Sequence, residues 1–105
     1  MSVNEMDLKN KIAVVLVGTE KDEELINVLK NVKYAELRID EFLRNFDEKE
    51  IVEWIKKIRR FGENTLIGTL RWYKEGGDNS FYLPDKKRLE IFRIISEYVD
   101  IIDIE

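Results

Sequence analysis

Four short apolar segments alternate along the chain with three amphipathic ones, and this alternation limits the possible folds more than any other feature. Residues 12–17 form a continuous apolar run, residues 34–39 and 101–105 alternate between apolar and polar side chains, and residues 65–71 form an apolar strand that ends in an arginine. Between these segments, apolar residues recur at helical spacing. The order predicts a βαβαβαβ chain, and strands that alternate with helices form a parallel sheet with right-handed crossovers.

The three predicted helices have recognisable starts and apolar stripes. Thr19 with Asp22, and Asp47 with Glu50, have the spacing of capping boxes, and Asp85 is placed to cap the third helix. We expect the stripes to pack on the sheet; they consist of Leu25, Val28, Leu29 and Val32, then Ile51, Trp54, Ile55 and Ile58, then Leu89, Phe92 and Ile95.

Two architectures fit this order: half of a (β/α)8 barrel, or a small doubly wound, flavodoxin-like sheet. The central strands of a doubly wound sheet are apolar on both faces, as the 12–17 run suggests for the first strand. The other three strands have one apolar face and one face with charges near the C-terminal end, which favours a barrel. We therefore predict that residues 1–105 form one half-barrel domain without its second half, with residues 1–10 as a loose N-terminal arm.

Composition excludes several classes of function. A net charge of −4 argues against a nucleic-acid partner, and no apolar run is long enough to cross a membrane, so a cytoplasmic protein is expected. The chain has no cysteine and no histidine. It therefore lacks a thiolate nucleophile, the commonest general base and the commonest metal ligand, and we expect no metal and no cofactor.

Charged residues gather on one predicted face of the sheet. They come from three strands, share the same parity and lie towards the C-terminal ends; they are Glu36, Arg38, Arg71, Asp103 and Glu105. Burying charges is costly unless they pair, so this set predicts an Arg/Glu network that holds an anionic substrate. The alternative is an ion-pair network with a purely structural role.

Three segments resemble a known enzyme family. Glu36-Leu37-Arg38-Ile39-Asp40, then Thr69-Leu70-Arg71 running into Lys74-Glu75-Gly76-Gly77, then Asp100-Ile101-Ile102-Asp103-Ile104-Glu105, are similar in order and spacing to the first half of the type I 3-dehydroquinate dehydratases. The resemblance implies a (β/α)8 fold and, without a metal or cofactor, the dehydration of 3-dehydroquinate in the shikimate pathway of aromatic amino acid biosynthesis. The positions of Glu36, Arg38 and Arg71 match residues that bind the substrate in that family. The positions of Asp40, Glu75 and Asp103 match acidic residues with a supporting role.

The resemblance also implies what this chain does not carry. In that family a lysine forms an imine, a Schiff base, with the substrate ketone, and a histidine moves the protons; both belong to the second half of the barrel. Some members have a serine on the first strand where this chain has Val15. We therefore expect no catalytic residue in this chain, and no activity from the chain by itself. Aromatic residues around the Gly-Gly loop are candidates for a lid over the substrate or for packing on the third helix; they are Trp72, Tyr73, Phe81 and Tyr82.

The expected partners follow from the same reading. One is the small-molecule substrate 3-dehydroquinate. The other is either a second copy of the chain or a complementary second half-barrel. The chain itself could be an excised fragment, a truncated gene product or a subunit of a split enzyme. A non-catalytic, homodimerising half-barrel that binds a small carboxylate is the main alternative. A flavodoxin-like signalling domain is a weaker one, because the first strand ends at Gly18 without an acidic cluster that could hold Mg²⁺.

Overall fold

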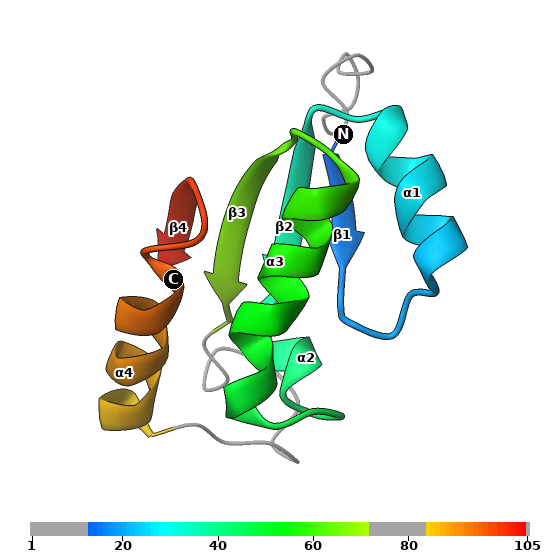
Figure 1. Cartoon of the computed structure of the whole chain (residues 1–105). Helices are drawn as coiled ribbons and strands as arrows, with labels where there is room; N and C mark the ends of the chain where they lie inside the picture. Colours follow the sequence, from blue (N-terminus) through cyan, green and yellow to red (C-terminus); the bar gives the residue numbers. More distant parts are fainter. Residues whose placement is uncertain (1–12, 72–83, 105) are drawn as a thin grey trace.

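A computed structural model describes residues 13–71 and 84–104, and within them a parallel sheet alternates with helices (Figure 1). The elements, in chain order, are β1 (Ala13–Leu16), α1 (Asp22–Lys30), β2 (Tyr34–Arg38), α2 (Ile39–Phe42), the 3₁₀ helix η2 (Glu48–Glu50), α3 (Ile51–Phe61), β3 (Thr65–Leu70), α4 (Asp85–Ile95) and β4 (Ile101–Ile104). This is the βαβαβαβ order expected from the sequence, with a short additional helix, α2, directly after β2.

The described strands lie in the order β1-β2-β3-β4, and each is parallel to its neighbour. The four arrows in Figure 1 accordingly point the same way. Right-handed crossovers that always step in one direction place their helices on one face of a sheet, whereas a doubly wound sheet requires the order to reverse. The described strands show no reversal, so this order is the one found among successive strands of a (β/α)8 barrel.

The core lies on the outer face of the sheet, the face that the helices cover. The outward positions of the two central strands are closed to solvent, with Ala35, Leu37 and Leu70 at 0% exposure and Leu66 at 1%. The helical residues packed with them in the same buried cluster are Leu25 and Leu29 of α1, Ile39 and Phe42 of α2, Ile51, Trp54, Ile55 and Ile58 of α3, and Ile91, Phe92 and Ile95 of α4. The alternating pattern of β2 and the apolar stripe of α3 are therefore confirmed.

The prediction that the first strand is buried on both faces was wrong. Leu16 is 1% exposed, whereas Val15 is 51% exposed and Ala13 is also exposed. Successive side chains of a strand point to opposite faces, and the described core lies on only one of them. An apolar run of this length therefore does not show that both faces are covered.

Two of the predicted helix starts were displaced. Helix α1 begins at Asp22 with Lys21 as its N-cap, and the Glu24 carboxylate accepts the Lys21 backbone N–H at 2.8 Å, so the Thr19–Asp22 box does not form. Asp85 is the first residue of α4 rather than its cap. The Asp47–Glu50 box is confirmed, since the Glu50 carboxylate accepts the Asp47 N–H at 2.9 Å.

The stripe predicted for α4 was partly wrong. Leu89 is 64% exposed, whereas Ile91 is fully buried together with Phe92 and Ile95. Both Leu89 and Ile91 are apolar, and the helix is rotated so that Ile91 faces the core.

A polar contact joins the start of β4 to the start of β3. The Asp100 carboxylate accepts the backbone N–H of Leu66 at 2.8 Å and a bond from Arg59 at 3.1 Å. The Leu66 N–H is the main reason that the pKa of Asp100 lies below its usual value, and the Arg59 guanidinium adds to the effect while burial opposes it.

Candidate functional site

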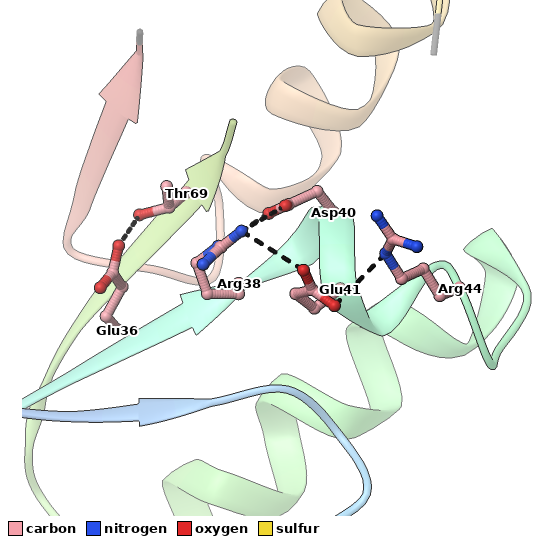
Figure 2. A network of polar contacts seen from close by, with 6 residues as sticks. All are labelled: Glu36, Arg38, Asp40, Glu41, Arg44 and Thr69. Atoms are coloured by element: carbon pink, nitrogen blue, oxygen red, sulfur yellow. Dashed lines mark hydrogen bonds and ion pairs between the residues drawn. The ribbon is translucent and has the colours of Figure 1, made fainter. Parts of the chain in front are cut away.

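The C-terminal ends of β2 and β3 bring polar side chains together on the inner face of the sheet, the face that carries Val15, Glu36 and Thr69. In the register of these strands Arg38 lies beside Thr69, and Glu36 beside Ile67. The Thr69 hydroxyl donates a 2.8 Å hydrogen bond to Oε2 of Glu36 (Figure 2). Thr69 is only 1% exposed and Glu36 is partly exposed, so this contact is part-buried.

Arg38 and Asp40 form a two-pronged ion pair beside this contact. Nε of Arg38 donates to Oδ1 of Asp40 at 3.0 Å, and Nη2 donates to Oδ2 at 2.6 Å. The strand ends at Arg38 and α2 begins at once, so the chain turns and Asp40 lies over the guanidinium. The side chain of Asp40 is 1% exposed and that of Arg38 16% exposed. A buried carboxylate needs such a partner, because desolvation is costly.

This pairing fixes the state of the arginine. The hydrogen bond that Arg38 donates to Asp40 is the main cause that raises the pKa of Arg38, burial opposes it, and the negative charges of Asp40, Glu41 and Glu36 add to it. Arg38 is therefore a permanent cation. Its Nη1 has no hydrogen-bond partner within residues 13–71 and 84–104, which leaves donors for a bound anion.

Two further residues extend the charges away from the sheet. Glu41 of α2 lies 3.6 Å from Nη2 of Arg38 and 3.3 Å from Nε of Arg44, so it stands between two cations (Figure 2). Glu41, Arg44 and Thr69 were not among the predicted site residues. The acid–base spacing of Arg38, Glu41 and Arg44 is the available signal for the first two, whereas the role of Thr69 depends on the strand register.

Two other candidate residues lie beside this network but are not bonded to it in the described part of the chain. Arg71 follows β3 directly and is exposed, and Asp103 of β4 lies beside Thr69 in the register and is also exposed. In the part of the chain that the structure describes, neither takes part in a hydrogen bond or ion pair with the network. Glu75, Glu105, Lys74 and the four aromatic residues of the predicted lid lie outside the described residues.

Apolar side chains occupy the middle of the same inner face. Val15 of β1 pairs with Glu36, which pairs with Ile67, which in turn pairs with Ile101 of β4. Val15 and Ile101 are 51% and 46% exposed. The face therefore combines a charged end, near the carboxyl ends of the strands, with an uncovered apolar middle.

The described residues contain no group of three or more acidic side chains arranged to hold a metal ion. None of the helices described is long and apolar enough to cross a membrane. The groups that the observed contacts bring together are a carboxylate, a guanidinium and the hydroxyl between the strands.

A sequence model described as type I 3-dehydroquinase matches residues 12–105, which include all three segments on which the resemblance rests. The chain belongs to the type I 3-dehydroquinase family. No curated protein and no solved structure gave a significant match.

Membership of this family confirms the resemblance and assigns the general activity. Type I 3-dehydroquinases are lyases of the shikimate pathway and act on a small-molecule substrate. The matched region contains every residue of the network in Figure 2. The carboxyl ends of the strands, where the network lies, are also where barrel enzymes carry their active sites.

Proposed function

We propose that this dehydroquinase chain is a single half-barrel domain that supplies the substrate-binding half of an active site. The reaction is the cytoplasmic dehydration of 3-dehydroquinate to 3-dehydroshikimate. The observation that supports this most directly is the cluster of Glu36, Arg38 and the buried Asp40 at the carboxyl end of β2, where Thr69 of the adjacent strand β3 is bonded to Glu36.

Each residue has a role that its surroundings support. Glu36, with one oxygen held by Thr69, accepts a hydrogen bond from a substrate hydroxyl. Arg38, held in place by Asp40, presents Nη1 to an anionic or hydroxyl group. Arg71 is exposed beside this site and binds the substrate carboxylate, because a guanidinium fork matches a carboxylate. Asp103, and Glu75 outside the described residues, support these arginines.

The bond-breaking chemistry belongs to groups that this chain does not supply. Imine formation requires a lysine with a depressed pKa, and proton transfer requires a base placed at the reacting carbon. The sequence contains no histidine. A second half-barrel would supply the lysine and the histidine, and the chain without it binds the substrate but does not dehydrate it.

Binding and turnover are separable in one set of measurements. The labelled chain is titrated with 3-dehydroquinate by NMR, and turnover is followed by the ultraviolet absorbance of the enone product. We expect shifts at Glu36, Arg38 and Arg71, no enone above background, and no mass increase after borohydride treatment. An Arg71→Ala variant should bind about tenfold more weakly, a factor that corresponds to about 1.4 kcal/mol.

Arg93→Ala is the matched control, because Arg93 is an exposed arginine of α4, away from the strand ends. It should bind like the unchanged chain. Equal binding by the Arg71 and Arg93 variants would contradict the role of Arg71. Product formation or a trapped adduct would contradict the proposed division between binding and chemistry.

The partner is proposed from the uncovered inner face. Val15 and Ile101 are exposed there, and β1 and β4 are the outer members of the described sheet, so each has an edge that no described strand pairs. A complementary half-barrel would cover this face without bringing two copies of Glu36 together, whereas a homodimer would place like charges face to face. Sedimentation velocity at increasing concentration should show self-association of the chain alone. A monomer at all concentrations would contradict the need for a partner.

A further inference from the structure

The hydrogen bond between Thr69 and Glu36 links adjacent strands on the inner face. It joins residues that are 33 positions apart in the chain, at 2.8 Å, and Thr69 is 1% exposed. The β-branched side chain of threonine has few rotamers within a strand, so its hydroxyl is held in a defined direction.

The surroundings of Glu36 make this hydroxyl important. The neighbours of Glu36 in the register are Val15 on one side and Ile67 on the other, and neither side chain can donate a hydrogen bond. Arg38, the next residue on the same face, directs Nε and Nη2 to Asp40. Thr69 is therefore the described side chain that donates to this carboxylate.

The two oxygens of Glu36 consequently differ. Oε2 accepts the threonine hydroxyl, whereas Oε1 has no hydrogen-bond partner within residues 13–71 and 84–104. A carboxylate with one oxygen held presents the other in a fixed direction, with a lone pair available to a hydroxyl donor.

We propose that Thr69 is a positioning residue for substrate recognition, which holds Glu36 so that Oε1 meets a hydroxyl group of the substrate. This inference rests on the proposed function, because it takes Glu36 as a substrate-binding group. A free glutamate loses up to about 2 kcal/mol of rotamer entropy when it becomes immobilised. The hydrogen bond from Thr69 restricts the Glu36 side chain before the substrate binds, so less rotamer entropy is lost on binding. This is the usual gain from a preorganised site.

The test compares three variants of the full chain. Thr69→Val keeps the shape of the side chain but removes the hydroxyl, whereas Thr69→Ser keeps the hydroxyl. Thr65→Val is the control, because it makes the same Thr-to-Val change on the same face of β3, at a residue with no hydrogen bond to Glu36 in the structure. In an NMR titration with 3-dehydroquinate, Thr69→Val should bind about tenfold more weakly, and the other two should stay within about twofold of the unchanged chain. Unaltered binding by Thr69→Val would overturn the inference.

A second measurement needs no ligand and separates this inference from the proposed function. In the unchanged chain, the two γ-methylene protons of a held Glu36 side chain should have distinct chemical shifts. Thr69→Val should reduce the separation of these shifts through rotamer averaging, and Thr69→Ser should keep it. An unchanged separation in Thr69→Val would overturn the positioning role, whatever the substrate does.

The two hypotheses therefore fail in different ways. If Thr69→Val reduces the separation of the Glu36 shifts but the unchanged chain binds no 3-dehydroquinate, the positioning role of Thr69 on Glu36 is retained and the proposed function is refuted. If Thr69→Val does not fold, the inference is tested by NMR of the unchanged chain. Its Thr69 hydroxyl proton should exchange slowly with water and show a nuclear Overhauser contact to the Glu36 side chain. Absence of both signals would refute the inference.

Discussion

Replacing Asp40 with asparagine tests the most buried part of the network. Asparagine has nearly the same size and keeps one acceptor oxygen, but it loses the charge and turns an amide N–H₂ towards one nitrogen of Arg38. One of the two bonds, at 3.0 and 2.6 Å, must therefore be lost. A hydrogen bond to a charged group contributes about 1.5–3 kcal/mol. Since 16% of the Arg38 side chain is exposed and water replaces part of the loss, we expect the free energy of unfolding to fall by about 2 kcal/mol.

The assay is urea and thermal unfolding of the Asp40→Asn chain beside a control. For a domain of this size, a loss of 2 kcal/mol lowers Tm by roughly 10 °C. Glu41→Gln is the control, because Glu41 lies farther from Arg38, at 3.6 Å, and its side chain is 36% exposed. Such a pair contributes less than about 1 kcal/mol. If the two variants lost the same stability, or if Asp40→Asn lost less than about 0.5 kcal/mol, the reasoning about the buried fork would be refuted.

Two other changes test the frame around the site. Gly18 has a φ of 107°, and an added Cβ would lie 2.4 Å from a ring carbon of Phe42. Gly18→Ala should therefore lower the free energy of unfolding, measured by urea titration, by about 2–4 kcal/mol. A loss below about 1 kcal/mol would contradict this expectation. The pKa of Asp100 is lowered in the folded state, chiefly by the Leu66 N–H, so its contribution to stability is complete above the unfolded pKa of about 3.9 and declines as the pH falls through the lower, folded value. The difference in unfolding free energy between the unchanged chain and Asp100→Asn should therefore be constant above about pH 5 and shrink below about pH 4, and a difference that stays constant to pH 2 would contradict the assignment.

Local patterns predicted the elements whose formation depends on neighbours in the chain. The alternation at 34–39 predicted that Ala35 and Leu37 are buried, and both are at 0% exposure. The Asp47–Glu50 capping box formed as expected, because its two groups are three residues apart and need no distant partner.

The predictions that failed concerned whether another layer of the protein covers an apolar residue. Val15 and Leu89 are as apolar as the residues that are buried, but Val15 is on the inner face and Leu89 on the outer side of its helix. Hydrophobic periodicity indicates that a face is apolar, but it does not indicate whether another layer covers that face.

Patterns along the chain are enough to establish the order of strands and helices, the parity that places Glu36, Arg38 and Thr69 on one face, and the family to which the chain belongs. These follow from spacing along one chain, since side chains alternate every second residue in a strand. Which of these groups are in contact depends on the folded chain. A hydrogen bond requires its atoms within about 3 Å, and that distance depends on strand register and on where each strand ends. The register joins Thr69 to Glu36, and the turn into α2 joins Asp40 to Arg38.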